Sequence, residues 1–452
     1  MKVIYFDVDS LRPDHLSAYG YRRPTSPNID RIAREGVVFG NCYASDSPCM
    51  PSRGSTISGR FGTRTGIVTH GPRGETMDLS VSTLPTILRD AGVTTAAIST
   101  FGRHPSPWFY VGWENFHDPS GWHFQMTPAW KINEAATEWL DKHAEEDFFL
   151  WVQYWDPHAY YNPPESCVDD IQTNDYPAHP TPEQVEGHQG DVFWHSAGMM
   201  GIHSYEDYKR VVDLYDGEIR YVDYHIGQIM EKLKTLGIGE DTVIIISADH
   251  GEELGEHGVY VEHWSVHDGT NRVPLIVRLP SSMKQTGIRD DLVYQMDLSA
   301  TVLELFGATV PKEWDSKPLF SGGKRSHLVI GHGLYTAQRA VVTDDWKLIR
   351  TYHGGQWNIP SVQLFDRRQD TYEQHSVADE HADVVEELSA HLATWEAEVA
   401  GQTDPMKKNA LDGPPGIQLY GQEMMIAYEQ DGTAMDVVLS ERKPAIGTKV
   451  QT

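Results

Sequence analysis

The sequence predicts an α/β protein in which a mostly parallel sheet lies between two layers of helices, with a smaller α+β unit towards the C-terminal end. Over about the first 320 of the 452 residues, short apolar runs alternate with amphipathic stretches of helical period. This alternation is typical of parallel sheets that are covered on both faces. After about residue 325, closely spaced strand-like runs precede one helical stretch, which predicts a small antiparallel sheet with one covering helix.

The strands and helices of the larger unit follow from local patterns. Strands are predicted where apolar runs are bounded by turn formers or acids, at 2–6, 93–100, 148–155, 241–248 and 273–280. Helices are predicted where capping residues open an amphipathic stretch and small or charged residues close it, at 26–36, 83–92, 132–146 and 205–237. In the smaller unit, strand-like runs lie within 327–333, 339–352 and 362–366, and a helix is predicted over 381–399.

These patterns divide the chain into four parts. We expect a large α/β domain over residues 1–325 and a small antiparallel-sheet-plus-helix subdomain over 326–400. Residues 165–205 are rich in Pro, His, Asp and Trp without periodicity, and we interpret them as an insertion or lid over the site. Residues 401–452 form a C-terminal tail that packs on the body or on another subunit, which is compatible with a homo-oligomer.

Composition and charge exclude several classes of function. The formal net charge is −28, with 65 acidic and 37 basic residues, which disfavours nucleic acids and anionic membranes as partners. An anionic small molecule remains compatible, because a local basic pocket can hold it. The N-terminal segment places acids directly after a short apolar run, so we expect neither a signal peptide nor a membrane span, and a cytoplasmic location. Three cysteines are too few for a disulfide framework or a Cys-rich zinc site.

Polar side chains follow three of the predicted strands at their C-terminal ends. Asp7 and Asp9 follow the first strand, the Asp-Pro-His segment with His158 follows another, and Asp249 and His250 follow a third. In sheets of this kind, ligands bind beyond the carboxyl ends of the strands. Carboxylates together with an imidazole suit a hard or borderline divalent cation. Each pair alone also reads as a solvated strand end.

The segment SPCMPSRGSTISGR at 47–60 holds a cysteine in polar surroundings. The prolines around Cys49 predict a loop, with a helix beginning near Ser55. A helix N-terminus and the neighbouring Arg53 would lower the pKa of the Cys49 thiol and favour a nucleophile. The alternative is a buried cysteine with no chemical role.

This segment resembles the signature of the sulfatase family, Cys-x-Pro-Ser-Arg followed at the right distance by Gly-Arg. Other segments resemble the same family: DSLRPDHLSAYGY, DPHAYYNPP, LYDGEIRYVD, SADHGEELGEHG, RVPLIVR, WKLIR and LFDRRQD. The resemblance covers about residues 3–400, apart from the insertion, and it implies an alkaline-phosphatase-like fold. In this family a separate formylglycine-generating enzyme oxidises the cysteine to an aldehyde. One hydroxyl of the hydrated aldehyde attacks sulfur, and the other later expels sulfate.

The resemblance also implies a metal site. Its ligands would be Asp9, modified Cys49, Asp249 and His250, with Asp7 as a further candidate. Many relatives carry two adjacent acids where this chain has Asp9 and Ser10, which leaves the full ligand set open. A carboxylate-rich site favours Ca²⁺. The imidazole also admits Mn²⁺, and Mg²⁺ is a third alternative.

The remaining roles are implied in the same way. Arg53 would hold the diol and the carboxylates, and His158 would act as general acid at the ester oxygen. His263 stands where relatives usually carry Lys and could also donate to the leaving oxygen. His104 is a further catalytic candidate. Sulfate contacts are expected from His70, Thr100, Arg103 and His104, with a structural role as the alternative for each.

The sequence therefore predicts a metal-dependent sulfuric ester hydrolase that cleaves a small-molecule or saccharide sulfate monoester. One alternative is a phosphonate monoester or phosphodiester hydrolase of the same superfamily, which a single acid after the first strand would suit. Ser52 favours the sulfatase. A second alternative is a binding protein whose Cys49 is never converted. Aromatic residues such as Trp108, Phe109 and Trp113 would suit stacking on a sugar or ordinary packing.

Overall fold

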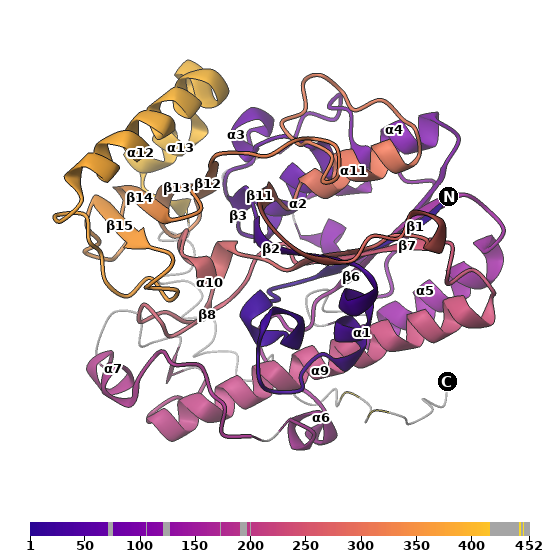
Figure 1. Cartoon of the computed structure of the whole chain (residues 1–452), viewed down its shortest axis with the longest axis horizontal. Coiled ribbons are helices and arrows are strands. Elements are labelled where there is room, and N and C mark those ends of the chain that lie inside the picture. Colours follow the sequence, from indigo (N-terminus) through magenta and orange to yellow (C-terminus); the bar gives the residue numbers. More distant parts are fainter. Residues whose placement is uncertain are drawn as a thin grey trace.

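The computed structural model describes residues 1–70, 76–104, 106–120, 127–171, 173–189, 197–198, 200–415, 443 and 446. A large sheet carries helices on both faces, and a small sheet lies at one end of it (Figure 1). Both sheets confirm the predicted fold class.

The large sheet has eight strands in the order β11-β2-β10-β7-β1-β6-β4-β5. Its neighbouring pairs are parallel except at β10, which is antiparallel to both β7 and β2. The central strands are buried along nearly their whole length, as expected for a sheet covered on both faces. The bounds are β1 Lys2–Val8, β2 Val37–Tyr43, β4 Thr94–Ile98, β5 Asn115–His117, β6 Phe148–Tyr154, β7 Thr242–Ser247, β10 Leu275–Arg278 and β11 Gly287–Tyr294.

Helices form a layer on each side of this sheet. One layer consists of α1 (Pro27–Glu35), α5 (Ala129–His143) and α9 (Tyr205–Thr235), and the opposite layer contains α2 (Cys49–Ser58), α4 (Leu84–Asp90) and α11 (Asp297–Leu305) (Figure 1). The Ser204 side chain caps the long helix α9 by accepting a hydrogen bond from Asp207 N. Two short helices, α3 (Gly62–Thr65) and α10 (Asp268–Asn271), lie in connections.

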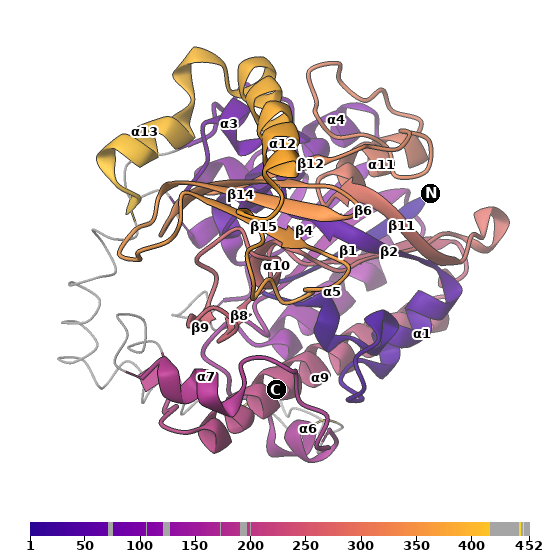
Figure 2. The same cartoon turned by 60° about the vertical axis from the view of Figure 1, so that its left-hand side comes forward.

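The small sheet has the order β15-β14-β13-β12-β3. Its antiparallel strands are β12 (Leu328–His332), β13 (Ala337–Val342), β14 (Trp346–His353) and β15 (Val362–Asp366), and α12 (Ala382–Trp395) packs on them (Figure 2). The fifth strand, β3 (Asp46–Ser47), comes from the N-terminal part of the chain and pairs in parallel with β12. The segment directly before Cys49 is therefore built into the C-terminal sheet.

The predicted insertion and tail are described in part. Within 165–205, α6 (Glu165–Asp169) and α7 (Pro182–Gly187) lie beside α9, and a covering role over the site stays a prediction. Within the tail, α13 (Pro405–Asp412) packs on β13 and β14. Lys443 Nζ lies 2.5 Å from both Asp156 Oδ1 and Glu218 Oε2. The rest of the tail lies outside the described residues.

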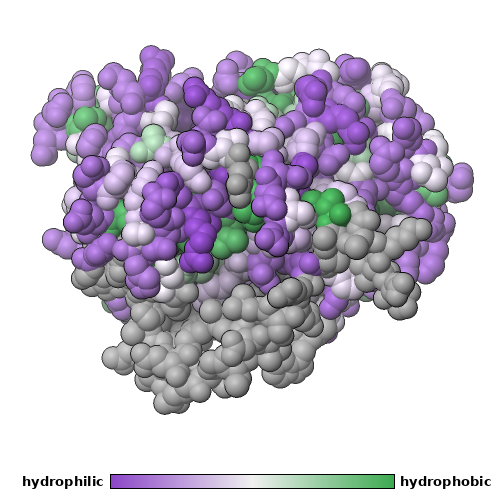
Figure 3. Space-filling view, turned by 90° about the horizontal axis from the view of Figure 1, so that it is seen from below, coloured by the Kyte–Doolittle hydropathy of each residue, from purple (hydrophilic) through white to green (hydrophobic). Residues whose placement is uncertain are grey.

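None of the helices in the described part of the chain is both long enough and apolar enough to span a membrane. A small second antiparallel pair, β8 (Glu253–Leu254) and β9 (Tyr260–Glu262), forms a hairpin beyond the end of β7. Seen from below, the described surface is largely hydrophilic, with only scattered hydrophobic patches (Figure 3).

Candidate active site

The carboxyl ends of the three central strands bring the predicted acids together. In the parallel register, Asp7 of β1 lies opposite Gln153 of β6 and Ser247 of β7. Asp9 and Asp249 lie two residues beyond Asp7 and Ser247, at neighbouring strand ends, and both are fully buried. The edge of the sheet that the strand pattern predicted is therefore the place where the acids meet.

Arg53 of α2 holds all three carboxylates. Its Nε donates to Asp7 Oδ2 at 2.7 Å, and its Nη1 donates to Asp9 Oδ2 at 3.0 Å and to Asp249 Oδ2 at 2.6 Å. The guanidinium also lies over the Phe101 ring, 4.6 Å from its centroid. All four charged side chains have no solvent exposure, so three negative charges face one positive charge in a dry environment.

The excess negative charge is visible in the pKa values of the acids. Burial raises the pKa of Asp249 well above its usual range although Arg53 opposes this, and Asp9 adds to the rise. Burial also pushes the pKa of Asp9 upward, but Arg53, His158 and His250 outweigh it and lower that pKa to about 2. An additional cation beside these acids would relieve the repulsion.

Helix α2 begins at Cys49 itself, so the prediction that it begins near Ser55 is wrong. The first turn accommodates Pro51 because its missing N–H is not needed there. All ten residues of α2 are buried, and its polar side chains find partners. Ser52 Oγ donates to the Asp249 carbonyl at 2.6 Å, and Ser55 Oγ donates to Asp46 Oδ2 at 3.0 Å. These bonds explain why a buried helix can be so polar.

The residue that follows α2, Gly59, must be a glycine for a steric reason. Gly59 has φ of +63°, in the left-handed region, and an added Cβ would lie 2.1 Å from the Trp314 ring. A helix therefore ends here only with glycine.

The expected low pKa of the Cys49 thiol is also corrected. Burial raises this pKa well above its usual range, and Asp9 and Asp249 raise it further while Arg53 lowers it. The N-terminus of α2 and one guanidinium do not offset two neighbouring carboxylates. As an unmodified thiol in this environment, Cys49 is a poor nucleophile.

Four donors converge in one buried group: Asp9, Cys49, Asp249 and His250, whose ligand atoms all lie within 4.8 Å of one another. His250 Nδ1 donates to the Gly251 carbonyl at 2.8 Å, so Nε2 carries the lone pair, and it lies 3.1 Å from Cys49 Sγ. Two carboxylates, a neutral imidazole and the unbalanced negative charge fit a divalent cation. Asp7 lies outside this group, because Arg53 and Trp151 Nε1 bind its carboxylate.

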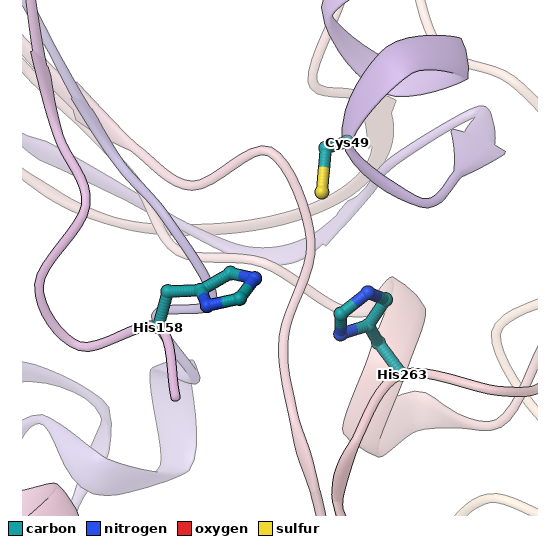
Figure 4. A group of neighbouring side chains, drawn as sticks. All are labelled: Cys49, His158 and His263. Carbon is teal, nitrogen blue, oxygen red and sulfur yellow. The ribbon is translucent and has the colours of Figure 1, made fainter. Parts of the chain in front are cut away.

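Two further imidazoles also approach Cys49, and one of them, His263, lies beside the His250 ring, with ring centroids 4.2 Å apart. In His158 and in His263, one ring nitrogen lies within 4.8 Å of Cys49 Sγ, and these two nitrogens lie within 4.8 Å of each other. His158 Nδ1 donates to the Ala159 carbonyl at 2.7 Å, and His263 Nδ1 lies 3.2 Å from Glu252 Oε1. The second nitrogen of each ring is therefore turned to the space beside Cys49 (Figure 4).

The predicted sulfate contacts are placed less uniformly. His70 and His104 are buried and meet edge to face, with ring centroids 4.6 Å apart. Thr100 Oγ1 accepts a hydrogen bond from Trp155 Nε1. Arg103 forms an ion pair with Asp118 at 2.7 Å and is partly exposed. Contact with sulfate stays a prediction for all four.

Sequence reasoning missed two residues near Cys49. Glu252 is buried, and burial raises its pKa to about 8. His332 at the end of β12 contacts Ser47 Oγ through Nδ1 at 2.9 Å. The signal for His332 was present, because it follows an apolar strand as the acids do. Trp108 and Phe109, by contrast, are core residues, which favours packing over stacking on a sugar.

The eight-stranded sheet between helix layers, with a group of potential cation ligands at its carboxyl edge and a small C-terminal sheet, defines an alkaline-phosphatase-like fold. A sulfatase family model matches residues 2–308, and a model for the C-terminal region of N-sulphoglucosamine sulphohydrolase matches 255–398. The chain belongs to the sulfatase family, and it is an enzyme of the class that hydrolyses sulfate esters.

Individual relatives are distant. The chain is 23% identical to an N-acetylglucosamine-6-O-sulfatase of Bacteroides thetaiotaomicron, over 83% of this chain and 82% of the relative. A solved structure bound to its substrate D-glucosamine-2-N,6-O-disulfate superimposes with a TM-score of 0.73 at 20% identity, covering 89% of this chain and 99% of that one. A phosphonate monoester hydrolase from Silicibacter pomeroyi gives 0.72 at 18% identity, covering 89% and 96%.

Proposed function

We propose that this sulfatase acts through a formylglycine formed from Cys49 and holds one divalent cation beside it. The observation that carries the proposal is the position of Cys49. Its Sγ lies within 4.8 Å of three other potential cation ligands, Asp9, Asp249 and His250, and also within 4.8 Å of a ring nitrogen of His158 and of His263. The thiol itself is poorly activated there, so the position suits a modified residue better than a cysteine. Oxidation would require a separate formylglycine-generating enzyme, and the hydrated aldehyde would supply the attacking hydroxyl.

Asp9, Asp249, His250 and modified residue 49 would hold the cation. When bound, it would neutralise sulfate oxygens and acidify the attacking hydroxyl. We favour Ca²⁺ because carboxylate oxygens dominate the donor set, with Mn²⁺ and Mg²⁺ as alternatives.

The protein's own residues bind the ester and handle its proton. Arg53 keeps Asp9 and Asp249 fixed, so that the donors are preorganised before substrate arrives. His158 and His263 each turn one nitrogen to the space beside residue 49, where either ring, in its imidazolium form, can donate the proton of that nitrogen to the departing ester oxygen. The buried walls exclude water, which strengthens these interactions.

We further propose that the substrate is a sulfated saccharide. The support comes from the N-acetylglucosamine-6-O-sulfatase relative and from the structural neighbour that binds a glucosamine disulfate.

A matched rate comparison tests the proposal. One preparation is assayed with an aryl sulfate, an aryl phosphonate monoester and a phosphodiester, with Ca²⁺ or Mn²⁺ added, beside Cys49→Ala. We expect dominant sulfate turnover that is lost in the variant, and a residue-49 aldehyde by mass spectrometry. Sulfate turnover by a protein whose residue 49 is an unmodified thiol would refute the formylglycine.

Phosphonate monoester or phosphodiester hydrolysis is the second candidate. Ser10 occupies the position after Asp9, and its hydroxyl donates to Asp9 Oδ1 at 2.9 Å. The strand therefore offers one acid to the cation at this point. Dominant turnover of the phosphonate or the diester in the same assay would favour this activity.

A further inference from the structure

Glu252 lies between the two loops that carry the imidazoles beside residue 49. Its side chain is 1% exposed, and Oε1 lies 3.2 Å from His263 Nδ1. Its second oxygen, Oε2, accepts a hydrogen bond from Tyr161 at 3.5 Å. Tyr161 follows His158 in the same loop. One carboxyl group thus contacts the His263 side directly and the His158 loop through a tyrosine.

The backbone at Glu252 is itself held in place. Its carbonyl accepts a hydrogen bond from Arg12 Nη1 at 2.9 Å, and the same nitrogen donates to Glu256 at 2.5 Å. The Tyr161 ring packs against Tyr215, whose hydroxyl accepts from Arg12 N at 3.0 Å. Buried groups that contact one another therefore hold Glu252 in place. A residue that positions a neighbouring side chain needs such support.

An imidazole has two nitrogens, and the partner of one decides where the other points. We propose that Glu252 is a positioning residue for proton transfer to the leaving group, because it fixes His263 Nδ1 and so turns Nε2 toward residue 49. As the S–O bond of the ester breaks, the leaving oxygen would keep the bonding pair and take the Nε2 proton of the His263 imidazolium, which would return to the neutral ring with Nδ1–H held by Glu252. The inference rests on the proposed function and deepens it.

The adjacent residue provides a matched comparison. Glu253 is equally buried, but its carboxylate pairs with His257 Nδ1 at 3.0 Å. His257 faces the backbone carbonyls of Tyr372 and Glu373. Two successive glutamates thus hold two histidines, and only the Glu252 pair faces residue 49. Glu253→Gln changes a side chain on the same backbone segment, but this side chain does not contact the imidazole beside the reacting atoms.

The test compares Glu252→Ala, Glu252→Gln and Glu253→Gln with the unaltered enzyme. Values of kcat and KM are measured for aryl sulfates of graded leaving-group pKa, or for phosphonates if these are turned over instead. Bound metal is quantified in every variant, because residue 252 is close to His250 in sequence. A crystal structure of Glu252→Ala reports the orientation of the His263 ring independently of activity.

We expect Glu252→Ala to lower kcat about 10- to 100-fold with little change in KM, and the loss to grow for poorer leaving groups. Glu252→Gln should recover part of the rate, since its amide can still bond Nδ1. Glu253→Gln should stay within about twofold, metal content should be unchanged, and the His263 ring should turn in Glu252→Ala.

Three results would overturn the inference: an equal loss in Glu252→Ala and Glu253→Gln, a loss that accompanies missing metal, or an unmoved His263 ring. An unaltered enzyme that turns over none of the esters would count against the proposed function instead. In that case the ring orientation still decides the role of Glu252.

Discussion

Two clusters of charged side chains lie close together in this molecule, and they differ in the number of cations that accompany their carboxylates. In the active-site cluster, Asp7, Asp9 and Asp249 share the single cation of Arg53. In the junction cluster, where the small subdomain meets the large one, every carboxylate has a cation close by. That cluster consists of Glu253, His257, Asp268, Lys347 and Glu373.

The pKa values follow this difference in balance. Burial and the neighbouring acids raise the pKa of Asp249, whereas His257 outweighs burial at Glu253 and lowers that pKa to about 2. Burial alone therefore does not mark a functional acid. A buried surplus of one charge is the stronger indication of a functional site, because unpaired buried charge is costly unless a counter-ion offsets it.

The largest effect on activity is expected when one of the surplus carboxylates of the active-site cluster is removed. Asp249→Asn should lower kcat/KM by about 1,000-fold or more, because a cation ligand is lost. In chelator, the same variant should unfold at a higher temperature than the unaltered protein, since an unfavourably buried charge is gone. Steady-state kinetics and thermal unfolding in chelator measure the two effects. A variant that is inactive and also less stable in chelator would contradict the surplus-charge argument.

A substitution in the junction cluster should lower stability and leave activity unchanged, in contrast to Asp249→Asn. Lys347 is fully buried and pairs with Asp268 at 2.6 Å and with Glu373 at 2.7 Å. Lys347→Met leaves the buried Glu373 and the partly buried Asp268 without this cation and should lower the free energy of unfolding by about 3–5 kcal/mol. Turnover per folded molecule should be unchanged. Lys324→Met, where the exposed lysine pairs with Asp291, is the control and should change stability by less than about 0.5 kcal/mol.

The stabilisation by an added cation should distinguish variants of the two clusters directly. Adding Ca²⁺ at about 100 times its dissociation constant should stabilise the chelated protein by about 2.7 kcal/mol. Lys347→Met should gain the same increment, whereas Asp249→Asn should gain much less. Thermal unfolding with and without the ion measures this. Equal gains in both variants would place the ion elsewhere.

The smallest effect is a pH dependence at His257. Burial opposes its charge, but Glu253 prevails and raises the pKa of His257 from 6.5 to about 9. A raised pKa means that the folded state holds the proton more tightly. The stabilisation is therefore complete below pH 6.5, declines between pH 6.5 and 9, and is lost above.

Urea unfolding from pH 6 to 10 tests this against His257→Gln. The stability difference between the two proteins should be about 1–3 kcal/mol at the acid end and should vanish at the alkaline end. A difference that does not change with pH would show that His257 is neutral in the fold.

Much of the site could be predicted because its donors follow apolar strands. Asp9, Asp249 and His250 were found in this way, and parallel strands bring their ends together. The signature identified Cys49 and Arg53. The start of α2 was misplaced because prolines at 48 and 51 suggested a loop, although a proline in the first turn is compatible with a helix.

Other features carried no local signal. A strand of two residues such as β3 has no periodicity to detect, and the antiparallel direction of β10 depends on the route of the chain. Glu252 and Glu253 are identical in sequence terms, and only the turn after β7 decides which one faces His263. The approach of His332 depends on how the small sheet docks.

The pairing of β3 with β12 sets an order of events during synthesis. Ser47 contacts His332, 285 residues later in the chain, so the wall next to Cys49 cannot close until that strand has been made. At about 5–20 residues per second, the ribosome needs roughly 15–60 s to cover this interval. In the finished fold Cys49 is 2% exposed. The time before β12 emerges is thus a natural window in which a modifying enzyme could reach the cysteine, and the topology of two short strands sets its length.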